Sequence, residues 1–323
     1  MKNYRKIFGT FLGITLFSGA VWVIQKELAT WRPEAIYASW QQLPALNIVF
    51  AAILTMASYT VLTGYDTLAL YVTGKRLAYR DIAQASFMGY AFSNNIGLSM
   101  VAGASVRYRI YSDLGLSAAD IARVFALCVI TAWLGFFTLA GLIFTCRPMP
   151  LEGTSISFFP DTRGIGIALI CAVAFILVLS ASRGKRLRIL GREFTIPGPG
   201  LISKQLALSI TDWSIASGVL YVLIPKDADI GFMTFTGIFL LAQVAGFSSQ
   251  VPGGLGVFDA VMLVLLSSSV PAKQVIVALL AYRAIYYIAP LVLAAILMGM
   301  REIRVAKNRS GGTGIIPGPP AKR

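Results

Sequence analysis

The apolar run from Gln274 to Met300 most constrains what this 323-residue chain can fold into. It is long enough to cross a bilayer as a helix, because a crossing needs about 20 residues. Arg283 lies about ten residues into this run, where insertion scales give a cost of about 2.5–3.5 kcal/mol for arginine. Its side chain must therefore face protein, water or a ligand. Together with Tyr282 and Tyr286, it indicates a polar site inside a membrane protein.

The composition supports a membrane protein built of helices. Charged residues make up 13% of the chain, against about 25% in soluble domains, and the mean hydropathy is +0.73. The apolar runs have helical length, which favours an all-α polytopic protein over a barrel. We expect one membrane domain over residues 1–303 and a cytoplasmic tail over residues 304–323, disordered in its Gly- and Pro-rich part. The eight expected spans are Ile7–Ile24, Leu46–Val72, Ala118–Thr145, Gly164–Ser182, Gln205–Ile224, Ile230–Phe247, Leu255–Ser269 and Gln274–Met300.

A ninth apolar segment, Ile82–Val106, contains polar residues and glycines that should break a helix. Ser93, Asn94 and Asn95 lie near its middle. Broken backbone at membrane depth is tolerated only where protein or water satisfies it, so we expect a re-entrant pair of half-helices. The string Gly246–Pro252 resembles the one around Asn94, and paired interrupted segments are a pattern that transporters use to build a midplane site. Seven residues do not by themselves establish a repeat.

The basic residues predict the orientation in the membrane. With the N-terminus inside, 21 of the 28 Lys and Arg residues lie in expected cytoplasmic stretches, six lie in expected outer loops, and Arg283 is the remaining one. This asymmetry follows the positive-inside rule and places both termini in the cytoplasm. It also explains the net charge of +14 without a nucleic-acid partner. The basic loop Arg183–Ser203 could contact anionic headgroups or serve only to set the topology.

The sequence lacks the usual signs of enzyme chemistry. It contains no histidine, no P-loop motif, no HExxH and no CxxC, and its three cysteines are interpreted as small core residues. We therefore expect no catalytic residue, no metal site and no cofactor, and we expect the chain not to be an enzyme.

Three groups of residues are candidates for a binding site. Gln250, Pro252, Gly253 and Gly254 break a helix before the next one starts, either to aim helix N-terminal amides at an anion or to form a tight turn. Arg107, Tyr108 and Arg109 form either a rim that grips phosphate groups or an ordinary interfacial anchor. Three acids lie inside expected spans, and they either pair with Arg283, the one deep cation expected, or act as a proton relay or counter-charge. These acids are Asp66, Asp212 and Asp259.

Three strings in the chain resemble one known family. They are RYRIYS from Arg107, VPGGLGVF from Val251 and YRAIYY from Tyr282. Together they are similar to the membrane region of the bacterial lysylphosphatidylglycerol synthases, the multiple-peptide-resistance family, over nearly the whole chain. The resemblance implies handling of a lipid by a flippase-like membrane domain. The family's cytosolic aminoacyltransferase domain has no counterpart in the sequence, so aminoacyl transfer is not expected.

The leading hypothesis is a translocase or binding protein, in the bacterial inner membrane, for a phospholipid or polyprenyl-linked lipid with a phosphate-bearing headgroup. The alternative is a non-catalytic membrane partner for a separate lipid- or glycan-modifying enzyme, docked through Arg183–Ser203. The expected substrate-binding residues are Asn94, Asn95, Arg107, Tyr108, Arg109, Gln250, Pro252, Gly253, Gly254, Tyr282, Arg283 and Tyr286.

Overall fold

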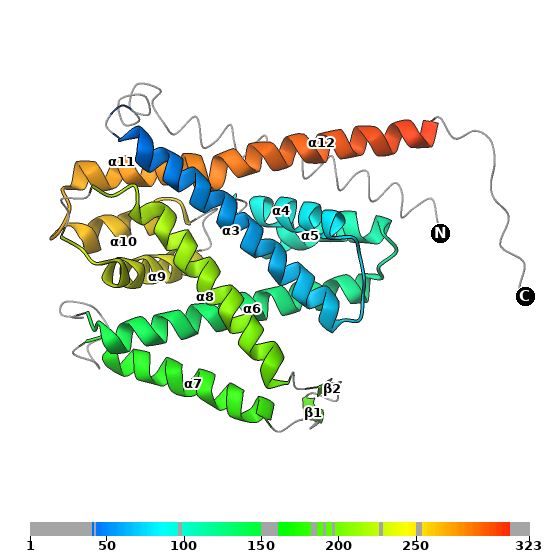
Figure 1. Ribbon diagram of the computed structural model, residues 1–323, viewed down its shortest axis with the longest axis horizontal. Helices are drawn as coiled ribbons and strands as arrows, with labels where there is room; N and C mark the ends of the chain where they lie inside the picture. The colour runs from blue at the N-terminus through cyan, green and yellow to red at the C-terminus, as the bar shows by residue number, and fades with distance from the viewer. Residues whose placement is uncertain are drawn as a thin grey trace, which may run out of the picture.

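The computed structural model describes residues 41, 43–95, 99–149, 161–181, 186–189, 192–195, 198–225, 229–249 and 254–310. These residues are helical apart from one short β-hairpin and the connections, which confirms the expected helical architecture (Figure 1). The expected first span, Ile7–Ile24, lies outside them. The elements are α3 (Ala45–Val72), α4 (Tyr79–Asn95), α5 (Ser99–Asp113), α6 (Ala118–Cys146), α7 (Arg163–Ala181), β1 (Arg186–Ile189), β2 (Arg192–Thr195), α8 (Pro199–Tyr221), α9 (Phe232–Ser249), α10 (Val257–Leu266), α11 (Ala272–Tyr282), the π-helix η2 (Arg283–Ile288) and α12 (Ala289–Ser310).

Three of the described helices are long and apolar enough to cross a membrane. They are Ala45–Val72, Ala118–Cys146 and Ala272–Val305, the last of which joins α11, η2 and most of α12. The start of α6 is fixed by a capping box, in which the Asp120 N–H donates to Ser117 Oγ at 3.2 Å. The eight-span count and the side on which the termini lie stay predictions.

Helices α4 and α5 fold back on each other where the sequence predicted a broken segment. They contain 17 and 15 residues, about 25 Å and 22 Å of helix, and pack with Gly89 beside Arg107 and Gly103 beside Ser93. This pairing is antiparallel. A Cβ at Gly103 would overlap the Ser93 hydroxyl, so the glycine allows the close approach. The two-helix form of the segment agrees with the prediction of paired half-helices.

A second folded-back pair is formed by α9 and α10. Gly246 and Gly254 face each other, and a Cβ at Gly254 would lie 3.2 Å from the Gly246 Cα. Gly254 and Gly256 have φ angles of +64° and +77°, which favour glycine. Helix α10 has ten residues, about 15 Å, against about 30 Å of hydrocarbon. The full crossing expected at Leu255–Ser269 is therefore not formed by α10 alone.

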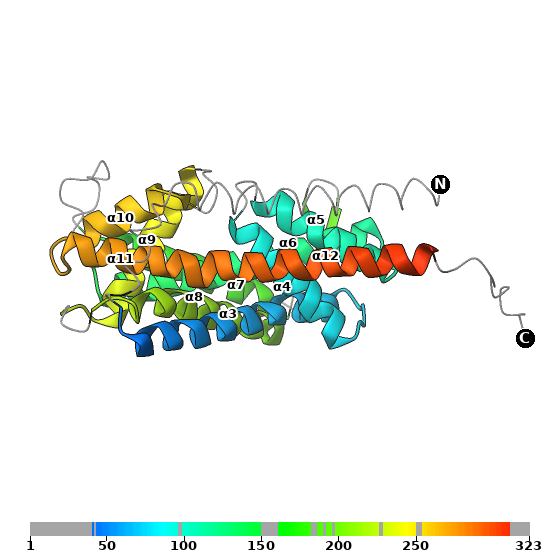
Figure 2. The ribbon, with the colours of Figure 1, turned by 90° about the horizontal axis from the view of Figure 1, so that it is seen from above.

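Most buried apolar side chains of the described residues fall into two large clusters, one toward each end of the long helices, and a third, small cluster contains Leu134, Val173 and Ile202. One cluster joins α9, α10 and α11 to the C-terminal halves of α6 and α8. The other joins α4, α5 and α12 to the C-terminal half of α3 and the N-terminal half of α6. The long helix α11–η2–α12 runs past both folded-back pairs (Figures 1 and 2). Helix α3 contributes residues to both clusters, as does α6, and these helices tie the two ends together.

Two peripheral segments differ from simple loops and tails. The basic loop expected at Arg183–Ser203 contains the antiparallel strands β1 and β2, with Arg188 opposite Glu193, and then the start of α8 at Pro199. Helix α12 continues to Ser310, so the domain boundary expected at residue 303 lies within a helix. The tail from residue 311 onward lies outside the described residues.

Candidate functional site

The π-helix η2 marks the polar centre of the long helix. Arg283 lies about 16 Å from the start of this helix by helical rise, close to half the thickness of a bilayer. Pro290 lacks an N–H and cannot bond to the carbonyl of Tyr286, four residues earlier. The hydroxyl of Tyr59 donates to that carbonyl instead, at 3.4 Å. Wide turns of this kind are rare and occur frequently at functional sites.

Arg283 is held by a carboxylate from the second folded-back pair. Its Nε donates to Asp259 Oδ1 at 3.2 Å, and its Nη2 donates to Oδ2 at 2.6 Å. Asp259 Oδ2 also accepts the backbone N–H of Gly256 at 2.9 Å and so caps the start of α10. The Arg283 side chain is 7% exposed and that of Asp259 is 26% exposed. The pair therefore lies at the edge of the buried region, with the carboxylate the more accessible partner.

The first folded-back pair reaches the same π-helix from the other side. The Asn95 side chain, at the end of α4, donates to the Tyr287 carbonyl at 3.2 Å and to the Ala91 carbonyl at 2.8 Å. The side chain of Asn94 lies within hydrogen-bonding reach of the Tyr59 hydroxyl. Two of the expected site residues, Asn95 and Arg283, are thus brought to one turn of one helix.

Asp212 of α8 is buried beside η2 and is surrounded by hydroxyl groups. Tyr65 donates to Oδ2 at 3.0 Å and Ser58 donates to Oδ1 at 3.3 Å. Ser58 Oγ also lies 3.0 Å from the Tyr286 hydroxyl. The Tyr286 ring stacks on Tyr282, with centroids 5.2 Å apart. A chain of hydrogen bonds therefore leads from Asp212 through Ser58 to Tyr286, three residues after Arg283.

Arg107 does not form an exposed rim, because its guanidinium is buried against Asp66. Both Nε and Nη2 donate to this carboxylate at 2.8 Å, and the side chains are 1% and 0% exposed. The Tyr111 hydroxyl adds a third hydrogen bond to Asp66, at 2.9 Å, and the Tyr90 ring lies 4.4 Å from the Arg107 guanidinium carbon. The expectation that Arg283 is the one deep cation was therefore wrong. A headgroup contact for Arg107 stays a prediction, and it would require this ion pair to open.

Arg109 belongs to a cluster of four charged side chains that joins α5 to α12. Its Nη1 donates to Asp113 at 2.6 Å and its Nη2 to Glu302 at 2.8 Å, while Arg301 donates to Asp113 at 2.9 Å. The Arg109 side chain is 2% exposed. Tyr108, between the two arginines, packs on the apolar cluster of α4 and α5. These contacts fasten the first folded-back pair to the long helix.

Sequence reasoning missed the contribution of α3. Ser58, Tyr59 and Tyr65 supply most of the hydroxyl groups around Asp212 and Tyr286, and only their position within an apolar span could have pointed to them. Of the expected turn residues, Gly254 is described and lies just before α10, facing Gly246 of α9. Gln250, Pro252 and Gly253 lie outside the described residues.

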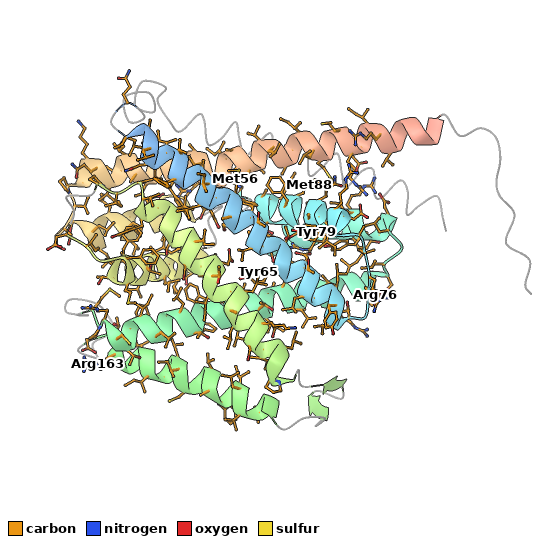
Figure 3. The ribbon with its side chains drawn as sticks, in the orientation of Figure 1. Met56, Tyr65, Arg76, Tyr79, Met88 and Arg163 are labelled. Atoms are coloured by element: carbon orange, nitrogen blue, oxygen red, sulfur yellow. The ribbon has the colours of Figure 1, made fainter. Side chains whose placement is uncertain are left out.

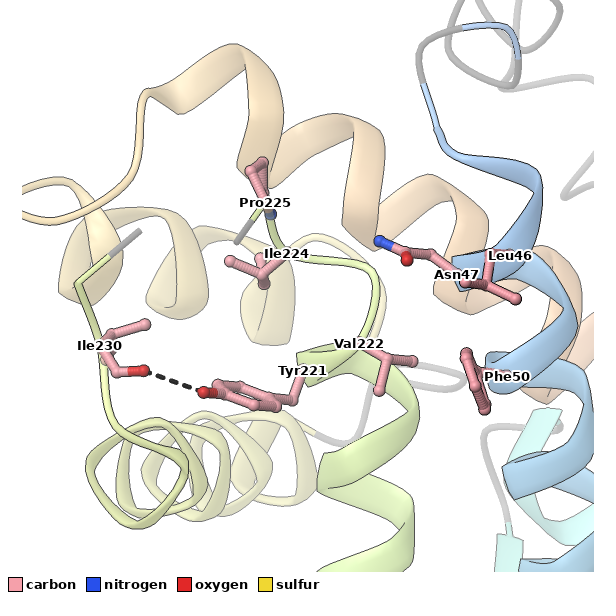
Figure 4. A pocket seen from close by; sticks show the side chains of 8 residues that line it. All are labelled: Leu46, Asn47, Phe50, Tyr221, Val222, Ile224, Pro225 and Ile230. Atoms are coloured by element: carbon pink, nitrogen blue, oxygen red, sulfur yellow. Dashed lines mark hydrogen bonds between the residues drawn. The ribbon is translucent and has the colours of Figure 1, made fainter. Parts of the chain in front are cut away.

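A cavity of about 260 Å³ lies at the N-terminal end of α3 and the C-terminal end of α8, away from the polar cluster (Figure 4). Its walls are mainly apolar, and Tyr221 on its edge donates to the Ile230 carbonyl at 3.1 Å. Among the described residues, no charged side chain lines it, and none of the residues expected to bind a headgroup borders it.

Helices with a bilayer-spanning length, two folded-back helix pairs and a buried charged centre define an integral membrane protein. Residues 10–294 match the family described as the lysylphosphatidylglycerol synthase TM region, so the chain belongs to that family and the resemblance is confirmed. The Synechocystis protein slr0712 is 36% identical over 315 residues, covering 96% of this chain and 98% of that protein. Inner membrane protein YbhN of Escherichia coli is 34% identical over 80% of each chain. A phosphatidylglycerol lysyltransferase of Staphylococcus aureus is 26% identical, and the match covers 97% of this chain but 36% of that protein.

Proposed function

We propose that the chain binds the phosphate-bearing headgroup of a membrane lipid at Arg283 and moves that lipid between leaflets. The observation that carries this proposal is the Arg283–Asp259 pair, placed where both folded-back helix pairs meet η2. Transporters with interrupted helices bind their substrates near the bilayer midplane in arrangements of this kind. The family supports a lipid-related role, since its name refers to a lipid-modifying enzyme.

Asp259 occupies the position that a phosphate group would take. Its carboxylate is held by the two-pronged contact of Arg283 and by the Gly256 amide at the start of α10. A guanidinium and helix N-terminal amides are also the groups that bind phosphate oxygens. A lipid phosphate would therefore exchange with the Asp259 carboxylate. Because Asp259 is the more exposed partner, it can leave without uncovering the rest of the buried cluster.

The proposed location is the bacterial inner membrane, with both termini in the cytoplasm. The similarity to YbhN, which is named as an inner membrane protein, supports this location. The positive-inside asymmetry supports the orientation. Aminoacyl transfer is not part of the proposal, because the match to the lysyltransferase covers only 36% of that protein.

The test is lipid retention and lipid movement by purified protein. Native mass spectrometry of wild type beside Arg283→Ala should show a phosphate-bearing lipid kept by wild type and lost by the variant. In proteoliposomes, Arg283→Ala should slow the movement of a fluorescent phospholipid or polyprenyl phosphate at least tenfold, a rise of about 1.4 kcal/mol in the activation barrier. The matched control is Arg163→Ala, an exposed arginine at the start of α7 that is labelled in Figure 3.

Equal lipid retention and equal movement by wild type and a folded Arg283→Ala protein would refute the proposal. A charge-reversed pair, Arg283→Asp with Asp259→Arg, separates binding from folding. It restores an ion pair but moves the guanidinium from η2 to α10. If that variant folds and still moves lipid at the wild-type rate, the pair has only a structural role.

The second candidate, a membrane partner for a separate enzyme, is favoured by the β1–β2 hairpin. This hairpin lies between α7 and α8, in a loop for which an interfacial helix or hairpin was one of the expected forms. Its first strand contains Arg186 and Arg188, and a basic segment of this kind suits an acidic partner surface. Replacing residues 186–195 by a Gly/Ser linker should abolish partner co-purification under this hypothesis. Lipid retention should remain.

A further inference from the structure

The three acids expected inside membrane spans, two of them buried, differ in how their charge is balanced. Asp66 pairs with Arg107 and Asp259 pairs with Arg283. Asp212, 7% exposed, accepts hydrogen bonds from Tyr65 and Ser58 alone, and within the described residues no lysine or arginine forms an ion pair with it. A carboxylate at membrane depth without a cation is costly, and protonation removes that cost.

The groups that surround Asp212 are neutral. The titratable side chains that interact electrostatically with it are Tyr59 and Tyr65 of α3, Tyr90 of α4 and Tyr286 of η2. Cys128 of α6 is buried beside Tyr65 and Tyr90. Arg107 lies on Tyr90 and is held by Asp66. None of these groups balances a negative charge on Asp212 by direct contact.

The hydroxyl chain gives protonation of Asp212 a structural consequence. Each hydroxyl has one hydrogen to donate. When Asp212 is ionised, Ser58 donates to it, so the Tyr286 hydroxyl must donate to Ser58. When Asp212 is protonated, its O–H can donate to Ser58, Ser58 can donate to Tyr286, and the Tyr286 hydrogen becomes available to another acceptor. Either atom can be the donor across the 3.0 Å contact between Ser58 and Tyr286.

We propose that Asp212 is a proton-binding site whose occupancy sets the direction of the Ser58–Tyr286 hydrogen bond and so couples proton movement to ligand binding at Arg283. In the step, hydronium gives a proton to a carboxylate oxygen of Asp212: one O–H bond of hydronium breaks, the O–H bond of the carboxylic acid forms, and a water molecule is left. The reverse step returns the proton to water. The proton site itself stands on the geometry of the buried cluster, and only its coupling to a lipid rests on the proposed function.

Infrared spectroscopy of the reconstituted protein tests the proton site directly. A protonated carboxylic acid has a carbonyl band that shifts when hydrogen is replaced by deuterium. Wild type should show such a band at mildly acidic pH and lose it at alkaline pH, and Asp212→Asn should lack it. The exposed Asp229→Asn is the matched control and should keep the band. In Ser58→Ala the band should persist at a shifted frequency, because one hydrogen-bond partner is gone; this variant also serves if Asp212→Asn does not fold.

The inference would be overturned if the wild-type spectrum contained no carbonyl band that titrates with pH and is absent from Asp212→Asn. This outcome would leave the proposed lipid function standing, because the measurement requires no lipid movement. Coupling is tested separately with an imposed pH gradient. The gradient should change the rate of lipid movement at least threefold in wild type and in Asp212→Glu, and should have no effect in Asp212→Asn. A gradient effect that survives in Asp212→Asn would refute the coupling.

Discussion

Arg107 and Asp66 form a two-contact ion pair that is sealed from solvent, whereas Arg283 and Asp259 form the same contact with the carboxylate 26% exposed. Buried pairs stabilise little relative to apolar replacements, but removing one partner leaves an uncompensated charge. A partly exposed pair can instead exchange one partner for a ligand. We therefore expect loss of the first pair to lower stability, and the proposed headgroup binding involves the second pair.

The first prediction concerns the sealed pair. Arg107→Ala should lower the free energy of unfolding by about 3–5 kcal/mol, because Asp66 would remain buried without its cation. Thermal unfolding in detergent measures the change. Lys75→Ala is a control, since Lys75 pairs with Asp120 at the surface and should leave the unfolding temperature unchanged. An Arg107→Ala protein as stable as wild type would show that Asp66 is neutralised in another way.

The second prediction separates the two contacts of Asp259. Asp259→Asn keeps an oxygen that can accept the Gly256 amide but removes the negative charge that competes for Arg283. Retention of a phosphate-bearing lipid should rise about tenfold, equivalent to about 1.4 kcal/mol. Asp259→Ala should lose the cap as well and become about 1 kcal/mol less stable. Weaker lipid retention in Asp259→Asn would indicate that the carboxylate helps to bind the lipid.

The third prediction tests the close packing of α4 on α5. Gly103→Ala should destabilise the protein, since the added methyl group would overlap the Ser93 hydroxyl. Overpacking of this kind costs about 1–3 kcal/mol. Gly200→Ala is the matched control, because no atom lies within 4 Å of the Cβ that it would gain. In limited proteolysis or thermal unfolding, Gly103→Ala should be less resistant than both Gly200→Ala and wild type. Equal resistance would contradict the close contact between α4 and α5 at this position.

The fourth prediction concerns the contact between the first folded-back pair and η2. Asn95→Ala should remove the hydrogen bond to the Tyr287 carbonyl and cost about 1 kcal/mol in stability. Lipid movement should fall several-fold, because the end of α4 would no longer be fixed against the turn that carries Arg283. Asn47→Ala, in the cavity at the far end of α3, should leave the movement rate unchanged. If Asn95→Ala and Asn47→Ala move lipid at equal rates, Asn95 does not contribute to the site.

The sequence was sufficient to predict the membrane class, the two-helix form of Ile82–Val106 and the position of Arg283 within a long apolar helix. These predictions rest on local properties: apolar length, glycine and amide content, and the cost of a charge in lipid. The partners of the charges could not be predicted. Asp66 and Arg107 are 41 residues apart and Asp259 and Arg283 are 24 apart, so only the packing of helices determines which acid meets which arginine.

The error at Leu255–Ser269 has a related cause. An apolar run of 15 residues satisfies the composition of a membrane helix, but its helical part is ten residues long. Composition measures how well a segment is suited to lipid, and it does not measure where the backbone turns.

The division of the interior into two apolar clusters has a consequence for how the protein loosens. The clusters share α3 and α6, yet each contains one folded-back pair and one end of the long helix. Regions of this kind open as separate cooperative units, whose amide hydrogens exchange with solvent at different rates. The packing between the two units is weakest in the hydroxyl-rich layer at Ser58 and Tyr286, because a few hydrogen bonds replace apolar contacts there. Each half can therefore open locally while the other stays closed. Water would enter through the boundary layer that holds Asp212.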